Sequence, residues 1–353
     1  MDEGAGSITI TVVRSGDTST AASVEYGTFD FTASEKPDYT TSLGTIRFEP
    51  GETSKSFTVF ITDDAHVEGG ESLTLSLSNP QGVGLGAQST VTLTVTDNDL
   101  TPTQANPIDA PTFFVRQHYV DFLNREPDPD GFNFWTNDIT VCGSNADCLT
   151  DRRTNVSGAF FLSIEFQRTG YLIYLMEKAS FGNMPRYRAF IRDTQAIGKG
   201  IVVGAQGWEA QLESNKQAFI EEWANRTEFK TVYDSKSNPE FVDALFANAG
   251  VTDVAARDSL VAGLQAGTET RSSVLRKVIE NQTFSQKEFN PAFVLMQYFG
   301  YLRRNPDEGP DFNLDGFNFW LNKLNHFNGN YIDAEMAKAF ISSIEYRQRF
   351  GQP

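Results

Sequence analysis

The chain has 353 residues, of which 29 are Lys or Arg and 46 are Asp or Glu, so its formal net charge is −17. This balance argues against nucleic acid and against anionic membrane surfaces as partners, because both are bound by clustered basic side chains. No apolar run approaches the roughly 20 residues that cross a bilayer, so we expect no membrane insertion. At about 150 residues per domain, the length predicts two or three domains.

Charge and aromatic content change near residue 99. Residues 1–99 contain 4 basic and 15 acidic residues, whereas all four Trp and 24 of the 29 Phe lie after residue 99. Residues 100–112 contain three prolines and no hydrophobic period, which is typical of an exposed linker. We therefore predict a domain over 1–99, a Pro-rich linker over 100–112 and a second domain over 113–353.

The first domain has the pattern of an antiparallel β-sandwich. β-branched and apolar residues alternate with Thr and Ser, and clusters of Gly, Pro, Asp and Asn separate the alternating segments at short intervals. The pattern predicts strands at 7–13, 22–29, 44–50, 54–62, 72–78 and 89–96.

Many acidic residues of this domain lie beside the predicted strands. Glu3 precedes the first strand, Asp38 lies in a loop, four acids occupy ITDDAHVEGGE at 61–71, and TVTDND ends the last strand. Because hairpin loops of a sandwich meet at its poles, these carboxylates would repel one another unless a cation lay between them. Hard oxygen ligands in this number favour Ca²⁺ over Mg²⁺. Without an ion, the DD and DND segments are ordinary turn formers.

Residues 3–99 resemble a Calx-beta domain, an immunoglobulin-like calcium-binding sandwich of sodium–calcium exchangers and many bacterial surface proteins. The resemblance is carried by Phe48-EPGETSKSFTVFITDD, Glu68-GGE, Leu77-SNP and Asp97-ND, among other segments. Asn98 stands where better-charged members have a carboxylate, which implies fewer or weaker bound ions. The resemblance implies Ca²⁺ as cofactor and these ligands: Glu3, Asp38, Asp63, Asp64, Glu68, Glu71, Asp97, Asp99 and the backbone carbonyl of His66.

Members of that family usually begin with a strand ahead of the Glu-Gly segment, whereas this sequence starts at Met1. A processing boundary in a longer protein would explain the difference. Alternatively, a neighbouring copy supplies the strand to the unpaired sheet edge, which would build a fibre or array. The opening MDEGAGS has neither the basic nor the apolar region of a signal peptide, so an exported protein would be present here in a mature or trimmed form.

The second domain is predicted to be all-α and internally repeated, with clear copies at about 113–171 and 293–350 and a degenerate middle at 172–292. Repetition of helical units favours stacked helix pairs over a single catalytic fold. Three pairs of segments align at offsets of 179 to 185 residues: Tyr119-VDFLNREPD with Tyr298-FGYLRRNPD, Asp130-GFNFW with Asp315-GFNFW, and Ala159-FFLSIEF with Ala339-FISSIEY.

This repeat resembles a helical repeat family of unknown function that is common at the C-terminal ends of secreted bacterial proteins and distantly similar to phycobilisome linker domains. The resemblance implies a fold and a location but no reaction. Arg125 and Arg304 recur before the Pro-Asp turn, and Glu165 and Glu345 recur near helix ends. We interpret them as structural ion pairs rather than catalytic groups.

A second metal site is a weaker hypothesis. Asp311-FNLDG begins like an EF-hand loop, which makes Asp311, Asn313 and Asp315 candidate ligands. The twelfth position of such a loop needs a bidentate Glu, and here it is Asn322. A turn followed by a helix, with Phe-x-Phe-Trp packed in the core, is the favoured interpretation.

Cys142 and Cys148 bracket a short polar segment with no nearby His, which favours a disulfide over a zinc site. A disulfide implies an oxidising compartment and therefore export to the cell surface or the extracellular space, where calcium is abundant.

The sequence predicts a non-enzymatic protein. Its three histidines, His66, His118 and His326, are widely spaced, and neither H-E-x-x-H nor G-x-S-x-G occurs. The leading hypothesis is an exported, calcium-binding structural or adhesive protein of the cell surface or an extracellular assembly. One alternative is a carbohydrate-binding module that contacts surface polysaccharide through its aromatic side chains. The other is a strand-exchanging fibre or array subunit, whose partners would be further copies of itself.

Overall fold

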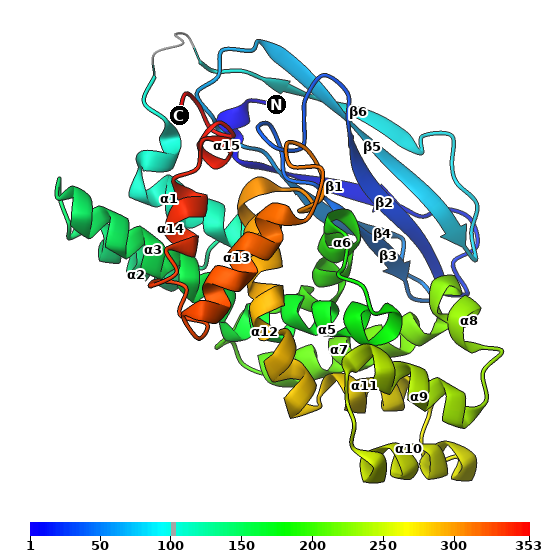
Figure 1. Ribbon diagram of the computed structural model, residues 1–353. Coiled ribbons are helices and arrows are strands. Elements are labelled where there is room, and N and C mark those ends of the chain that lie inside the picture. Colours follow the sequence, from blue (N-terminus) through cyan, green and yellow to red (C-terminus); the bar gives the residue numbers. More distant parts are fainter. Residues whose placement is uncertain (100–103) are drawn as a thin grey trace. The chain divides into compact units, whose positions relative to one another are not determined.

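The computed structural model describes residues 1–99 and 104–353, so residues 100–103 of the predicted linker lie outside the described residues. The chain divides into two compact units. Unit 1 contains residues 1–161, 297–304 and 330–353, and unit 2 contains residues 162–296 and 305–329. The division does not follow the composition change at residue 99, because the sandwich shares unit 1 with the first and last helical segments (Figure 1).

The sandwich of unit 1 consists of two antiparallel sheets, which confirms the predicted fold class of this part. All six predicted strands are present, with ends that differ by a few residues from the predicted bounds. One sheet pairs β1 (Ser7–Val13) with β4 (Ser54–Phe60), and the other has the order β3 (Leu43–Phe48), β2 (Ala22–Asp30), β5 (Gly70–Gln81), β6 (Thr90–Thr96).

The period-two pattern of the strands places their apolar side chains in the core. In β5, Leu73 and Leu75 are buried, whereas Thr74 between them is partly exposed. Leu73 and Leu75 pack in one buried cluster with Tyr39, Val59, Ile61 and Val95. Val12, Val24, Ile46 and Phe48 form a second buried cluster. Burial of this apolar surface is the main force that holds the two sheets together.

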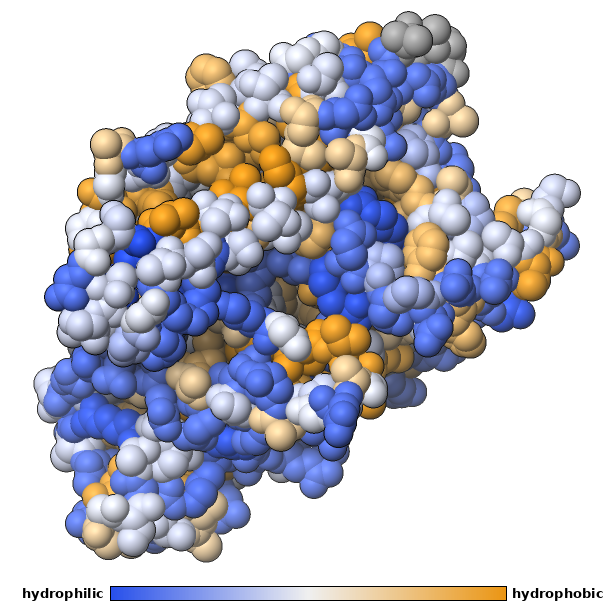
Figure 2. Space-filling model, turned by 180° about the vertical axis from the view of Figure 1, so that it is seen from behind, coloured by the Kyte–Doolittle hydropathy of each residue, from blue (hydrophilic) through white to orange (hydrophobic). Residues whose placement is uncertain are grey.

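Apolar side chains also reach the surface. Val13 and Phe31 of the sandwich are 72% and 73% exposed. On the face seen in Figure 2, orange apolar areas lie among blue polar ones. Within residues 1–99 and 104–353, no helix is both long and apolar enough to cross a membrane.

The helical part of unit 1 comes from both ends of the second domain. The elements are η2 (Pro107–Asp109), α1 (Pro111–His118), η3 (Tyr119–Leu123), α2 (Pro129–Thr140), α3 (Ala146–Leu162, whose last residue belongs to unit 2), η4 (Tyr298–Leu302), α14 (Met336–Ile341) and α15 (Ile344–Arg347).

The prediction of an exposed linker is wrong for two residues of its second half, whereas Asp109, Ala110 and Thr112 are exposed. Ile108 is 2% exposed and Asn106 is 6% exposed. The Asn106 side chain accepts a 3.2 Å hydrogen bond from the Ile108 backbone and thereby caps η2. A single Ile in a Pro-rich segment carries no periodic signal, so its burial could not be read from the sequence.

Unit 2 is built of helices whose ends follow ordinary capping rules. α9 begins with a capping box between Ser237 and Glu240 and ends at Gly250, which has a left-handed conformation (φ 67°). The helices are α4 (Ile164–Arg168), α5 (Gly170–Phe181), α6 (Tyr187–Gly198), α7 (Trp208–Asn225), α8 (Thr227–Tyr233), α9 (Asn238–Ala249), α10 (Val254–Ala266), α11 (Arg271–Ile279), α12 (Gln282–Gln297, whose last residue belongs to unit 1) and α13 (Asp315–His326).

The aligned segments of the two end copies share an unusual backbone. η3 and η4 are both five-residue π-helical turns, and each ends at a residue in the left-handed region, Asn124 (φ 51°) and Arg303 (φ 52°). π-helical turns are rare, so their occurrence at aligned positions supports the internal repeat.

Of the two predicted Arg–Glu pairs, the later one lies within unit 1. Arg304 Nε and Nη2 donate to Glu345 at 2.6 and 3.0 Å, so this ion pair is confirmed. Arg304 is 4% exposed and also lies over the Tyr298 ring, 5.3 Å from its centre. The pairing of Arg125 with Glu165 stays a prediction.

The expectation that Phe-x-Phe-Trp packs in the core is wrong for its second Phe. Phe317 is 5% exposed, but Phe134 of α2 and Phe319 of α13 are 62% and 58% exposed. Residues two apart on a helix point to nearly opposite sides, so both Phe side chains of one copy cannot face the same core.

Candidate metal centre

Two groups of carboxylates gather where the strands of the sandwich end. In the first carboxylate group, ligand atoms of Glu3, Asp97 and Asp99 all lie within 4.8 Å of one another. The same holds in the second carboxylate group, which consists of Asp38, Asp64 and Glu68. The structure therefore brings six of the eight predicted carboxylate ligands into two sets that could each hold an ion.

Backbone hydrogen bonds hold the segments that carry these side chains. Glu3 lies in the 3-10 helix η1 (Glu3–Ala5), and Gly6, which follows it, accepts a 2.9 Å hydrogen bond from Ile61 N–H. Thr62 N–H donates to the carbonyl oxygen of Asp38 at 3.0 Å. The start of β1, the end of β4 and the loop before β3 are thus tied together, which positions the carboxylates independently of any ion.

Four of the six carboxylates are buried, at 5 to 8% exposure: Glu3, Asp38, Asp64 and Asp99. The Oδ2 atoms of Asp64 and Asp99 are buried and have no hydrogen-bond partner in the described part of the chain. A buried carboxylate oxygen without a partner is costly, and a bound cation would supply what is missing. The donor set of hard oxygens fits Ca²⁺ in its chemistry.

The other oxygens of these groups accept backbone hydrogen bonds that orient the side chains. Asp64 Oδ1 accepts from His66 N–H at 2.7 Å, and Asp38 Oδ2 accepts from Ser34 N–H at 2.6 Å. Asp97 Oδ2 accepts from the N–H groups of Glu68 and Gly69, both at 2.7 Å. Asp97, from the first carboxylate group, therefore holds the backbone of Glu68, from the second.

Burial and mutual repulsion favour the protonated forms of these acids in the metal-free protein. Burial, with the charges of Asp99 and Asp97, raises the pKa of Glu3 to about 7. Burial, with the charges of Glu68 and Glu3, raises the pKa of Asp64 to about 8. Burial, with a hydrogen bond and charge from Glu71, raises the pKa of Asp38 to about 9. A divalent cation would replace these protons and remove the repulsion.

The remaining predicted ligands lie nearby, and their roles stay predictions. Asn98 Nδ2 donates to Asp63 Oδ1 at 3.0 Å. An uncharged amide therefore lies beside Asp63, where a second carboxylate would repel it. Glu71 lies in β5 opposite Val95. Besides its N–H contact to Asp64, His66 places its ring Nε2 2.9 Å from the carbonyl oxygen of Gln348.

The second metal hypothesis gains no support from the structure. Within the described residues, no third carboxylate, His or Cys joins Asp311 and Asp315 at the spacing found in the two carboxylate groups. Asn313 Oδ1 accepts a 2.8 Å hydrogen bond from Asp315 N–H, where α13 begins. This contact fits the turn interpretation.

The predicted disulfide is confirmed. Cys142 and Cys148 are joined, and they close the short connection between α2 and α3.

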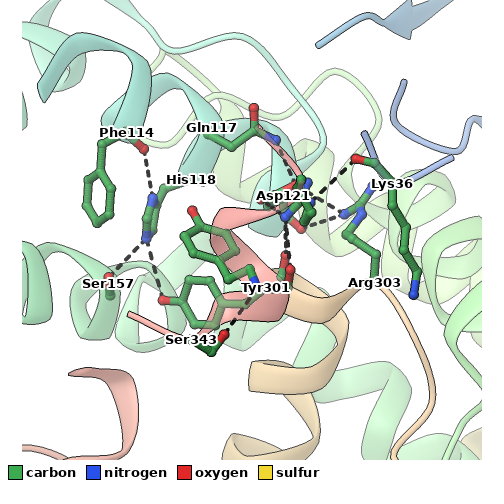
Figure 3. A network of polar contacts seen from close by, with 12 residues as sticks. Lys36, Phe114, Gln117, His118, Asp121, Ser157, Tyr301, Arg303 and Ser343 are labelled. Atoms are coloured by element: carbon green, nitrogen blue, oxygen red, sulfur yellow. Dashed lines mark hydrogen bonds and ion pairs between the residues drawn. The ribbon is translucent and has the colours of Figure 1, made fainter. Parts of the chain in front are cut away.

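Sequence reasoning missed a buried charge network in unit 1. Asp121 has a side chain that is 1% exposed and accepts from Arg349 at 2.9 and 3.0 Å. Gln117 Nε2 donates to the same carboxylate at 2.9 Å, and Arg303 lies 3.5 Å from it (Figure 3). Two Arg side chains and one carboxylate thus join η3, η4 and the end of the chain.

One signal for this network exists in the repeat itself. Asp121 aligns with Gly300, and Asn124 aligns with Arg303, so the copies carry different residues at two neighbouring positions. The two turns η3 and η4 contact each other. An acid in one copy and a base in the other, here Asp121 and Arg303, are the residues expected where two copies of a repeat meet.

His118 lies in the same buried region as a structural residue. Its Nδ1 is 2.8 Å from the Phe114 carbonyl oxygen, and its Nε2 is 3.0 Å from Ser157 Oγ (Figure 3). Burial lowers the pKa of His118 to about 4, so the ring is neutral at physiological pH.

Comparison with known families decides what the sandwich is. The Calx-beta domain model matches residues 1–99. These residues are a Calx-beta domain. The sodium/calcium exchanger Calx of Drosophila melanogaster is 39% identical over 98 residues, which cover 28% of this chain and 10% of that protein. Sodium/calcium exchanger 1 of Mus musculus is 34% identical over 116 residues, covering 28% and 12%. Extracellular matrix organizing protein FRAS1 of Mus musculus is 36% identical over 108 residues, covering 29% and 3%.

Two solved structures are similar over the same share of the chain. The calcium binding domain CBD12 of CALX1.1 is 38% identical, with 28% of this chain and 42% of that chain covered and a TM-score of 0.28. The apo-form Calx CBD1 domain is also 38% identical, with 28% and 88% covered and a TM-score of 0.27. The chain spans about an eighth or less of the curated relatives named above, so the Calx-beta assignment concerns its first part. The resemblance of residues 113–350 to a helical repeat family stays a prediction.

Proposed function

We propose that this chain is an exported, calcium-stabilised structural or adhesive protein without enzymatic activity. The observation that carries the proposal is the pair of buried carboxylate oxygens without hydrogen-bond partners in the described residues, Oδ2 of Asp64 and Oδ2 of Asp99, one in each carboxylate group. The names of the related solved structures, which describe calcium binding domains, point in the same direction.

The two carboxylate groups would hold the ions. Ca²⁺ takes about six to eight oxygen ligands, so carboxylates, backbone carbonyls and water would share its coordination. The ion supplies positive charge where Glu3, Asp64 and Asp99 repel one another. It would stabilise the folded state by mass action, by about 2.7 kcal/mol at a free concentration one hundred times Kd.

The loop that follows β4 also contacts the end of the chain. Ala65 N–H donates to the Phe350 carbonyl oxygen at 2.9 Å, and the His66 ring lies against the Gln348 carbonyl. Ala65 and His66 are within two positions of Asp64 in the sequence. Calcium that orders this loop would therefore also hold the C-terminal segment on the sandwich, which is a mechanical role suited to a structural protein.

Export is supported by the disulfide between Cys142 and Cys148, since disulfides persist mainly in oxidising compartments. Protein taken from its native source and treated with a thiol-blocking reagent should show no modification of either cysteine before reduction. Free thiols at both positions would contradict export.

Calcium binding is tested by thermal unfolding and calorimetric titration of the full chain in EGTA, in CaCl₂ and in MgCl₂. We expect a higher Tm and saturable heat with CaCl₂, and a much smaller effect with MgCl₂. The double substitution Asp64→Asn and Asp99→Asn should abolish the calcium effect. Asp151→Asn, which removes an exposed carboxylate of α3, is the matched control. An unchanged Tm when calcium follows EGTA would reject the site.

A carbohydrate-binding function is favoured by one further observation. α2 and α13 carry the same four exposed residue types at helical positions i, i+3, i+4 and i+7, although packing does not require surface residues to match. Amide and carboxylate groups beside an aromatic ring suit the hydroxyls and apolar faces of sugars. The residues are Asp130, Asn133, Phe134 and Asn137 in α2, and Asp315, Asn318, Phe319 and Asn322 in α13.

A glycan array would test this second function. Wild-type protein should retain a glycan that the Phe134→Ala, Phe319→Ala double variant does not retain, at equal Tm. Equal retention by the wild-type and double-variant proteins, or none by either, would reject these two helix faces as sugar sites.

A further inference from the structure

Unit 1 contains a cavity of about 180 Å³ whose lining includes none of the candidate calcium ligands. The lining residues include three basic side chains, Arg153 of α3, Lys338 of α14 and Arg347 of α15, and no acidic one. The apolar wall is formed by Ile108, Phe114, Leu149 and Ile341. A cationic cavity in a chain of net charge −17 is an unusual local concentration of positive charge.

One neighbouring carboxylate, that of Asp109, forms ion pairs with the two Arg side chains. Arg347 donates to both oxygens of Asp109 at 2.8 Å, and Arg153 Nη1 lies 3.4 Å from Asp109 Oδ1. Lys338 has no ion-pair partner within the described ranges, and Arg153 Nε is buried there without a hydrogen-bond partner. Two of the three cations thus share one carboxylate and the third has none, so positive charge and donor capacity remain.

The shape and lining restrict what could bind. A cavity of about 150 Å³ lined by apolar side chains accommodates benzene, so 180 Å³ is sufficient for one ring-sized group. Arg153 lies over the Phe114 ring at 5.3 Å, so its charge borders the apolar wall. The hydroxyls of Thr150 and Ser342 donate to the carbonyl oxygens of Ala146 and Lys338, and they are therefore not available as donors to sugar hydroxyls.

We propose that this cavity binds a small organic carboxylate with a ring-sized apolar body. The carboxylate would lie among Lys338, Arg153 and Arg347, and the body would contact the apolar wall. The site uses none of the candidate calcium ligands, and its test is made in saturating CaCl₂, so its failure can be told apart from a failure of calcium binding.

The probe for the test is 4-fluorobenzoate, observed by ¹⁹F NMR with the full chain in saturating CaCl₂. We expect saturable binding, and at least about tenfold weaker binding of uncharged 4-fluorobenzamide. Neither phosphate nor glucuronate at equal concentration should displace the probe. Equal binding of the amide, or full displacement by phosphate or by glucuronate, would overturn the proposal.

Three substitutions locate the site. Lys338→Gln should weaken binding by about threefold to tenfold, whereas Lys199→Gln, at an exposed lysine of the loop after α6, should leave it unchanged. Asp109→Asn should strengthen binding, because it removes the competing internal carboxylate. Leu149→Trp, which fills the cavity, should abolish it. If Leu149→Trp does not fold, the two lysine variants decide. Equal affinity of the Lys338→Gln and Lys199→Gln variants for the probe, or undiminished binding by folded Leu149→Trp, would reject the site.

Discussion

The backbone N–H of Ala65 donates a 2.9 Å hydrogen bond to the carbonyl oxygen of Phe350. Phe350 is fully buried and packs edge-on against Tyr346 and Phe113, with ring centres 5.3 and 5.4 Å away. The loop that carries Asp64 is therefore attached to the packed end of the helical sequence. A change in the order of this loop should therefore also change the order of residues near Phe350, which are far from it in the sequence.

Neutralising one buried carboxylate should have opposite effects with and without calcium. In EGTA near neutral pH, folding requires Asp64 to take up a proton, because burial and the charges of Glu68 and Glu3 disfavour its ionised form. Asp64→Asn removes this cost, so the free energy of unfolding should rise by about 1 kcal/mol. In saturating CaCl₂ the same substitution removes a ligand of the ion, so the free energy of unfolding should fall by a similar amount or more. Urea unfolding of the variant, with Asp151→Asn as control, measures both values. An equal loss under both conditions would indicate a purely structural role for Asp64.

The metal-free protein should become less stable as pH rises. The folded-state pKa values of Glu3, Asp64 and Asp38, about 7, 8 and 9, lie above their ordinary values of 4.5, 3.8 and 3.8. The folded state therefore binds more protons than the unfolded state in this range, and the stability contributed by these groups is lost as pH rises through 7 to 9.

This trend should be measured by urea unfolding between pH 7.5 and 9, where His118 is neutral in both the folded and the unfolded state. EGTA samples should lose stability across the range, and the loss should be smaller in Asp64→Asn. Saturating calcium should remove the trend, because the ion binds the ionised carboxylates. A flat profile in EGTA would contradict the shifted pKa values.

Calcium should also protect the junction between the sandwich and the C-terminal segment. Hydrogen exchange at the Ala65 amide depends on opening of its bond to Phe350, and we expect slower exchange with calcium than with EGTA. A peptide from α11 (Arg271–Ile279), which lies in unit 2, is the internal reference. If exchange at Ala65 is the same with and without calcium, the ion does not order this loop.

The charge network at Asp121 should be among the most sensitive sites in unit 1. Arg349→Met leaves the buried Asp121 carboxylate without its closest charged partner, and removal of one member of a buried pair costs about 3 to 5 kcal/mol. Asp121→Asn should also destabilise, and a double-mutant cycle should show coupling of about 1 kcal/mol or more. Additive losses in denaturant unfolding would show that the two side chains do not act together.

Much of the first domain follows from local pattern. Alternation along a strand decides which side chains face the core, and this depends only on the two-residue period of an extended backbone. Loop acids such as Asp64 and Asp99 could be expected to meet because strands of a sandwich end at common poles. The same reasoning explains why the six strands were predicted with small errors in their ends.

Other features depend on which surfaces meet. The sequence contains Asp121 and Arg349 but no periodic signal that joins them, since their contact arises only when η3 and the end of the chain pack together. The burial of Ile108 and the exposure of Phe134 also required the tertiary structure. Hydrophobic period and turn chemistry act over a few neighbouring residues and determine the elements themselves. Partner choice between distant elements depends on shape and charge complementarity that no local pattern encodes.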